Sequence, residues 1–274
     1  MKKILTYALV FISFLNLKAQ NTDFEKPVFK KGAVLLFWGW NRAWYSNSDI
    51  HFRGQGYDFQ LNNVKATDRQ TPFDFGTYFN PTKVTIPQTN AKVGYFIKDN
   101  VAVMLSLDHM KYVMKQDQTV DFNGNISDAT YTNMVNNGQV DLTNGEFLIF
   151  EHTDGLNYVN IGLEQYKNLL SKKNFDIVWA YGAGAGVLIP KTNAKLFGNE
   201  RSDRFHLAGF GADVRTSINF IVWKHIMARV EAKYGYINMP DVKTTLSAVD
   251  KASQDFVFGQ INFGIGYTFN TKKK

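Results

Sequence analysis

The chain has 274 residues, a formal net charge of +7, 45% hydrophobic residues and no cysteine. This length allows one large domain or two small ones, and the lack of cysteine excludes a lipoprotein anchor, disulfide bonds and thiolate metal sites. No basic stripe precedes the tail Lys272-Lys273-Lys274, so the charge does not indicate a nucleic-acid partner.

The first 20 residues have the organisation of a secretory signal peptide. A basic start at residues 2–3 precedes an apolar stretch at 4–17, and Lys18-Ala19-Gln20 supplies a small residue for cleavage. The apolar stretch is shorter than the roughly 18 residues of a spanning helix, which argues against a membrane anchor. Cleavage is predicted after Ala19 or Gln20. It removes three lysines and no acid, which lowers the net charge of +7 by three, to +4.

Period-two alternation of apolar and polar residues dominates the rest of the chain. It predicts eight strands, at 33–45, 84–97, 101–115, 156–168, 174–189, 205–220, 222–237 and 254–270. Each is near or above the roughly 9 to 11 residues that a transmembrane strand needs. Short connections at 98–100, 169–173 and near 221 alternate with long ones at 46–83, 116–155, 190–204 and 238–253. A soluble β-sandwich would also show the alternation within strands, but it has no reason to alternate its connections in this way.

The predicted fold class is therefore all-β, an antiparallel transmembrane up-and-down β-barrel of eight strands with long extracellular loops. The predicted organisation is a signal peptide at 1–20, a periplasmic N-terminal segment at 21–32, the barrel at 33–270 and a basic tail at 271–274. A barrel of ten strands is the alternative if Ile50 to Leu61 and a later segment enter the wall.

The last predicted strand carries a resemblance to a known class of proteins. It ends in Tyr267-Thr268-Phe269-Asn270, which resembles the aromatic-terminated last strand of bacterial outer-membrane barrels, although a further Thr-Lys-Lys-Lys departs from that pattern. The mature chain as a whole resembles the small, eight-stranded members of this class in the Gram-negative outer membrane. The resemblance implies a monomer that contacts outer-membrane lipid and lipopolysaccharide, and whose last strand contacts the barrel assembly machinery.

The inward register of the predicted strands carries charges of both signs. Gly182, Gly184 and Gly186 recur at alternate positions of one strand, where they make room for bulky neighbours across a narrow lumen. A barrel of eight strands is just wide enough to be filled by side chains, so these charges predict a packed ion-pair network, with a conducting pore as the competing interpretation. The predicted network comprises Lys92, Asp108, Glu164, Asp213, Arg215, Arg229, Glu231 and Lys233.

The long connection at 116–155 contains three hairpin turn signals. They are Asn123-Gly124, Asn137-Gly138 and Asn144-Gly145. Since they occur among alternating residues, they predict β-ribbons that extend above the membrane.

Four of the five histidines fall at the predicted extracellular end, among acids and amides, and this rim is the candidate site. It could hold a metal, work as a general acid and base, or grip lipopolysaccharide phosphate and sugar. No histidine pair has metal-ligand spacing, and alternation turns His109 outward beside the inward Asp108, so no metal and no cofactor is predicted. Catalytic candidates are His109, His152, Asp154 and His206, and ligand-binding candidates are His51, Arg53, Glu151, Asn157 and Arg204.

Three functions are open at this stage. The first is a non-enzymatic outer-membrane barrel whose loops bind a surface ligand or partner. The second is an outer-leaflet hydrolase or acyltransferase that modifies lipid A, but no histidine begins the His-x-Ser-Asn pattern of lipid A deacylases and no Gly-x-Ser-x-Gly elbow occurs. The third is a narrow channel. The enzyme hypothesis thus rests on the rim histidines alone.

Overall fold

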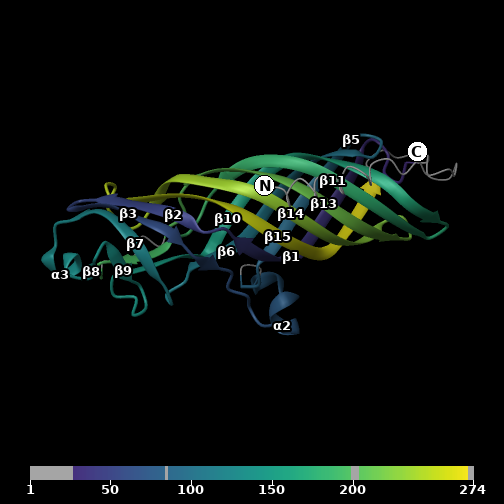
Figure 1. Cartoon of the computed structure of the whole chain (residues 1–274). Coiled ribbons are helices and arrows are strands. Elements are labelled where there is room, and N and C mark those ends of the chain that lie inside the picture. The colour runs from purple at the N-terminus through teal and green to yellow at the C-terminus, as the bar shows by residue number, and fades with distance from the viewer. Residues whose placement is uncertain (1–26, 84–85, 199–203, 271–274) are drawn as a thin grey trace, which may run out of the picture.

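The computed structural model describes residues 27–83, 86–198 and 204–270. Its long strands pair antiparallel with their neighbours, and β1 pairs with both β5 and β15, which closes a ring (Figure 1). The ring strands are β1 (Ala33–Tyr45), β5 (Thr89–Lys98), β6 (Val101–Met114), β10 (Leu148–Lys172), β11 (Phe175–Leu188), β13 (Gly209–Val222), β14 (Ile226–Lys243) and β15 (Lys251–Asn270). The predicted all-β antiparallel architecture is confirmed. None of the described helices is long and apolar enough to cross a bilayer.

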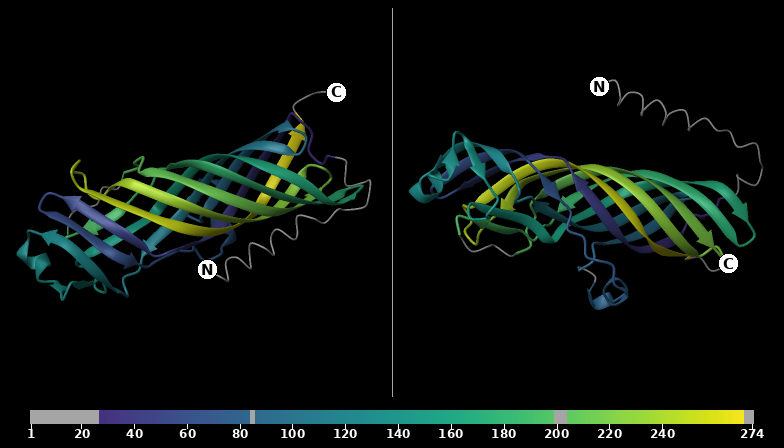
Figure 2. Two further views of the ribbon diagram at one scale, coloured as in Figure 1. Left: turned by 45° about the horizontal axis from the view of Figure 1, so that its top comes forward. Right: turned by 60° about the horizontal axis from the view of Figure 1, so that its bottom comes forward.

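One end of the ring, here called the loop end, continues into an extension of shorter strands. There β2 pairs with β15, and β3, β7, β9 and β8 follow in order. The extension lies at the left end of both views in Figure 2. The elements of these connections are β2 (Ser48–Gly54), β3 (Tyr57–Val64), β4 (Ala66–Thr67), α2 (Phe75–Tyr78), the 3-10 helix Pro81–Lys83, β7 (Thr119–Ile126), α3 (Ala129–Thr132), β8 (Val135–Asn136), β9 (Gln139–Asp141) and β12 (Asn193–Leu196). Residues 50–61 thus pair beyond the ring and do not enter it.

The opposite end, here called the turn end, has short connections. Only residues 99–100, 173–174 and 223–225 separate the strands there. The turn predicted near Ile221 lies a few residues later, where Trp223 and Lys224 take positive φ values of 51° and 65°. Two strand starts were also predicted too early, because β5 begins at Thr89 and β13 at Gly209. Residues 84–85 and the predicted signal peptide lie outside the described residues.

One of the three predicted hairpin turns is wrong. Asn123-Gly124 lies inside β7, where Gly124 is opposite Phe59 of β3 with a φ of 135°. The sequence signal misleads here because glycine also suits a close approach of two strands: a Cβ on Gly124 would lie 2.3 Å from the Asp58 carbonyl oxygen. Asn137-Gly138 does turn the chain between β8 and β9, with both residues at positive φ.

The interior of the ring has three layers. At the turn end, Phe29 enters the ring and stacks on Phe96 at 4.6 Å between ring centroids, beside Tyr166 at 5.0 Å. The middle layer holds the charged residues. At the loop end, a cluster of buried aromatic and aliphatic side chains that includes Phe52, Phe59 and Phe258 fills the extension. Two apolar layers therefore enclose a polar one.

The polarity of the two faces of the sheet inverts along β15. Near the loop end the buried face carries Phe256 and Phe258, and the following buried positions are Gln260 and Asn262. On the opposite face, the exposed apolar residues begin at the same level, with Ile261 38% exposed. At the level of the polar layer, the ring therefore has a polar interior and an apolar exterior, and the extension has the reverse.

Candidate functional site

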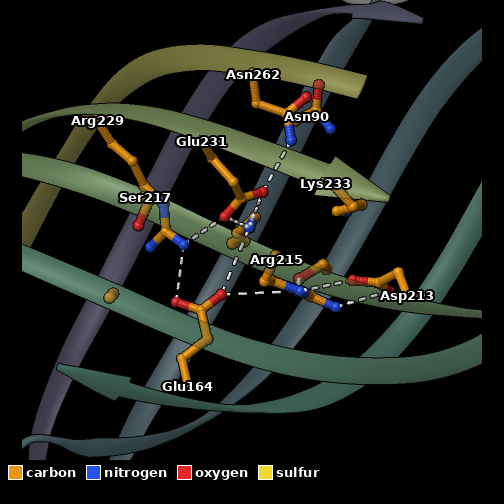
Figure 3. Close-up of polar contacts among 12 residues, drawn as sticks. Asn90, Glu164, Asp213, Arg215, Ser217, Arg229, Glu231, Lys233 and Asn262 are labelled. Carbon is orange, nitrogen blue, oxygen red and sulfur yellow. Dashed lines mark hydrogen bonds and ion pairs between the residues drawn. The ribbon is translucent and has the colours of Figure 1, made fainter. Parts of the chain in front are cut away.

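Arg229 bridges two carboxylates of the polar layer, those of Glu164 and Glu231 (Figure 3). Its Nη2 donates to Glu164 Oε2 at 2.9 Å and to Glu231, whose Oε1 accepts from Lys92 Nζ at 2.6 Å. Two longer ion pairs also reach Glu164 Oε1, from Lys92 Nζ at 3.6 Å and from Arg215 Nη1 at 3.7 Å. Each carboxylate is thus shared between two or more cations, as a buried charge requires.

The second half of the polar layer lies toward the loop end. Arg215 Nε donates to Asp213 Oδ1 at 2.8 Å, and the Tyr158 hydroxyl donates to Asp213 Oδ2 at 3.0 Å. Lys233 forms an ion pair with Asp108. Arg215 fits because its strand faces Gly184, where a Cβ would lie 2.3 Å from Arg215 Nη2.

All eight charged residues predicted for the lumen are therefore in this layer, each 4% exposed or less. Four are basic and four are acidic, so the layer has no net formal charge. Tyr158 and Tyr166 also join the network, through hydrogen bonds to Asp213 and Glu164. Neither tyrosine was predicted, because the prediction was limited to charged residues. The same period-two spacing that selects Glu164 would have selected both tyrosines.

A ladder of amides connects the polar layer to a loop at the rim. Asn90 donates to Asp108, Asn41 Nδ2 donates to Asn90 Oδ1 at 2.7 Å, and Gln88 Nε2 lies 3.3 Å from Asn41 Oδ1. Gln88 Nε2 also donates to Asp68 Oδ1 at 2.6 Å, and burial raises the pKa of this carboxyl above its ordinary value. Asp68 was missed because it lies in a predicted loop. Asn41 and Gln88 lie inside the predicted strands 33–45 and 84–97, but the prediction was limited to charged residues.

Two of the rim histidines pair with aspartates at separate places. His51 Nε2 on β2 lies 2.6 Å from Asp58 Oδ1 on β3. His206 Nε2 lies 2.9 Å from Asp241 Oδ2 on β14. A hydrogen bond from Lys251, together with the one from His206, lowers the pKa of Asp241.

His109 is held against the backbone of β10. Its Nδ1 lies 2.8 Å from Asn157 Oδ1, and the two residues are opposite each other in the β6–β10 pairing. The register of that pairing shifts between His152 and Leu156, and a Cβ on Gly155 would lie 2.7 Å from His109 Cε1. The bulge at Gly155 therefore leaves room for the imidazole against the strand, and His109 is only 4% exposed.

His152 lies inside the apolar core of the extension. It is fully buried, with Phe150 and Tyr112 as ring neighbours at 5.0 and 5.7 Å. The Gln254 amide nitrogen lies 3.1 Å from Nε2, so Nε2 accepts and Nδ1–H donates to Thr192 Oγ1 at 3.0 Å. Burial lowers the pKa of His152 from 6.5 to about 3. The side chain is thus a neutral core histidine.

The other candidates lie in different surroundings. Glu151 pairs with Arg69 Nη2 at 2.8 Å, and Asp154 lies 3.4 Å from Lys191 Nζ. Arg53 and Arg204 are exposed. Among the described residues, no group of three histidine, aspartate or glutamate side chains is placed to hold a metal ion. The rim histidines therefore lie on different elements with different partners.

No protein-family model and no curated protein sequence matches the chain. Among solved structures, it is similar to the outer membrane protein OprG from Pseudomonas aeruginosa, with 12% identity, a TM-score of 0.42, and coverage of 88% of this chain and 98% of that chain. It is also similar to Neisserial surface protein A, with 12% identity, a TM-score of 0.37, and coverage of 87% and 98%. It is similar as well to Ail, the attachment invasion locus protein of Yersinia pestis, with 12% identity, a TM-score of 0.31, and coverage of 87% of this chain and 99% of that chain.

Proposed function

We propose that this chain is a non-enzymatic outer-membrane protein that crosses the membrane with the eight ring strands and binds a surface ligand or partner through its extension. The observation that carries the proposal is the inversion of polarity along the strands. An apolar exterior over a polar, hydrogen-bonded interior suits hydrocarbon outside, and the reverse arrangement in the extension suits water outside. Each of the ring strands pairs with a neighbour on both sides, so the ring is closed and has no free edge strand.

The topology supports one orientation. Short turns lie on the periplasmic side of such barrels and long loops lie outside, so the turn end faces the periplasm and the extension faces the medium. A lumen filled by an ion-pair layer between two apolar layers supports a closed barrel and not a channel. Outer-membrane lipid and lipopolysaccharide are the expected surroundings.

The absence of cysteine provides a direct test of the orientation. Arg53→Cys on β2 and Lys173→Cys in a turn are both at exposed positions. A membrane-impermeant maleimide added to intact cells is expected to label position 53 and not position 173. After lysis, it is expected to label both positions. Equal labelling in intact cells, or recovery of the processed protein from the soluble periplasmic extract, would overturn the proposal.

Two further measurements test whether the lumen of the barrel is closed and whether the protein is non-enzymatic. Purified protein in planar bilayers is expected to show no steady conductance even at high protein load. The mass spectrum of extracted lipid A is expected to stay the same after gene deletion and in His109→Ala and His206→Ala. A new lipid A species in any of these strains contradicts the non-enzymatic assignment, and a steady current contradicts the closed lumen.

A further inference from the structure

A loop leaves the ring sideways through a gap in the pairing of β1, β5 and β6. β1 pairs with β5 only up to Trp40 opposite Thr89, and beyond that point side chains bridge β1 and β6 directly. The Tyr45 hydroxyl donates to the Lys111 carbonyl oxygen at 2.9 Å, and Asn41 Nδ2 donates to the His109 carbonyl oxygen at 3.2 Å. Residues 69–80, here called the side loop, begin at this gap.

The side loop is held in shape by its own hydrogen bonds. The Tyr78 hydroxyl donates to the Thr71 carbonyl oxygen at 2.6 Å, and Thr77 Oγ1 donates to Asp74 Oδ2 at 2.8 Å. At its base, Asp68 Oδ2 accepts from the Ala43 amide at 2.9 Å. Figure 1 and the right-hand view in Figure 2 show α2 of this loop standing out from the side of the ring, away from β3, β7 and α3.

This ordered loop nevertheless exposes three phenylalanine rings. Phe73 is 63% exposed, Phe75 71% and Phe79 48%. The rings contact one another. Phe73 meets Phe75 edge to face with centroids 5.0 Å apart, and Phe75 stacks on Phe79 at 5.6 Å. A contiguous apolar patch of this kind marks an interaction surface.

The side loop packs on the apolar outer face of the ring. Trp40 is only 6% exposed because Tyr78 and Phe79 cover it, with ring centroids at 5.8 and 5.1 Å. Trp40 also contacts Trp38 and Phe263, at 5.2 and 5.7 Å, and both belong to the outer face of their strands. The exposed phenylalanines therefore continue the apolar exterior of the ring.

We propose that Phe73, Phe75 and Phe79 insert among the acyl chains of the surrounding bilayer, so that the side loop is a lateral lipid anchor of the barrel. The occupant is lipid because the patch is continuous with the outer face that the proposed function places in hydrocarbon, and the inference rests on that proposal. Asp74 lies between Phe73 and Phe75 in the sequence and is exposed. This places the loop at the boundary of headgroups and acyl chains, where aromatic residues are favoured and a carboxylate still reaches water.

Single nitroxide labels in the cysteine-free chain test this depth. Phe75→Cys and Phe79→Cys are labelled, and Ile161→Cys, 60% exposed on the outer face of β10, is the wall reference. Leu246→Cys, also 60% exposed, is the control in the β14–β15 loop of the extension. The full-length mature protein is reconstituted at one copy per nanodisc of phosphatidylcholine and phosphatidylglycerol. Spin relaxation by oxygen, which concentrates in hydrocarbon, is compared with relaxation by a water-soluble nickel chelate.

The labels at 75 and 79 are expected to resemble the label at 161, with an oxygen-to-nickel collision ratio several-fold above that at 246. Nickel accessibility at 75 equal to that at 246 would place the loop in water and overturn the anchor. Protection from both reagents would mean that protein covers the rings, which also overturns it. If the label at position 161 is itself accessible to nickel, the proposal of a membrane barrel is wrong as well. Failure of the lipid anchor alone can therefore be distinguished from failure of the proposed function.

Discussion

The polar layer and the core of the extension are equally buried, yet opposite residues fill them. The polar layer holds four cations and four anions, while Phe52, Phe59, Phe147 and Phe150 fill the extension with exposures of 0–1%. The same strands pass through both regions, and β15 does so without a break in its pairing with β14 at this level. What differs is the medium that we propose outside the sheet. Where it is lipid, the polar residues turn inward, and where it is water, the apolar ones do.

Because of this difference, substitutions in the polar layer and in the extension should affect stability in different ways. A buried cation removed from the lumen leaves carboxylates that neither water nor lipid can solvate. Removing an aromatic side chain from the extension leaves a cavity, and the resulting loss of stability is limited to that part of the chain. The comparison can be tested at both places.

The largest effect is expected from Arg229→Met. Because both Glu164 and Glu231 lose a partner, the free energy of unfolding in lipid vesicles should fall by about 4–5 kcal/mol, as measured by urea titration. Lys173→Met, at an exposed turn position, is the matched control and should change it little. Adding Glu164→Leu to Arg229→Met should recover most of the loss. A stable single variant would show that the ion pairs do not hold the lumen.

Phe59→Ala should act on the extension alone. Phe59 is 1% exposed and stacks on Phe52 and Phe122 at 5.3 and 5.1 Å, so its loss should cost about 3 kcal/mol. Hydrogen exchange should accelerate in β2, β3 and β7 while the ring strands stay protected. Phe205→Ala, at a side chain 63% exposed, is the control. Faster exchange throughout the ring would contradict the separation of the two regions.

Acid should destabilise the extension through His152. Its folded pKa of about 3 is below the ordinary 6.5, so the unfolded extension binds the proton first as the pH falls. Stability is therefore complete above pH 6.5 and is lost progressively from there toward pH 3, by about 2 kcal/mol at pH 5. Protease sensitivity of β10 and β12 between pH 7.5 and 5 measures this loss. His152→Gln should remove its pH dependence, and an unchanged dependence would exclude His152 as the cause.

The smallest effect is expected at an exposed ion pair of the turn end. Lys30 Nζ lies 3.2 Å from Asp99 Oδ2, with side chains 62% and 44% exposed. Lys30→Ala should leave the free energy of unfolding almost unchanged, because water solvates both charges. A loss as large as that of Arg229→Met would show that charge pairing matters irrespective of burial.

The sequence by itself determined the features that follow from the alternation of apolar and polar residues with a period of two. Alternation and the lengths of the connections predicted antiparallel strands and an inward register from Lys92 to Lys233, because side chains of a strand alternate between its faces whatever the strand pairs with. Alternation did not distinguish a hairpin glycine from the close approach at Gly124, since both depend on the neighbouring strand.

Only the tertiary structure decided which groups meet. Arg229 pairs with Glu164 across the lumen, His152 lies in the apolar core of the extension, and the side loop leaves through a gap between β1 and β6. Each outcome depends on the stagger of strands far apart in sequence and on loops that pack on one another. Such contacts have no local period, so no pattern along the chain could have predicted them.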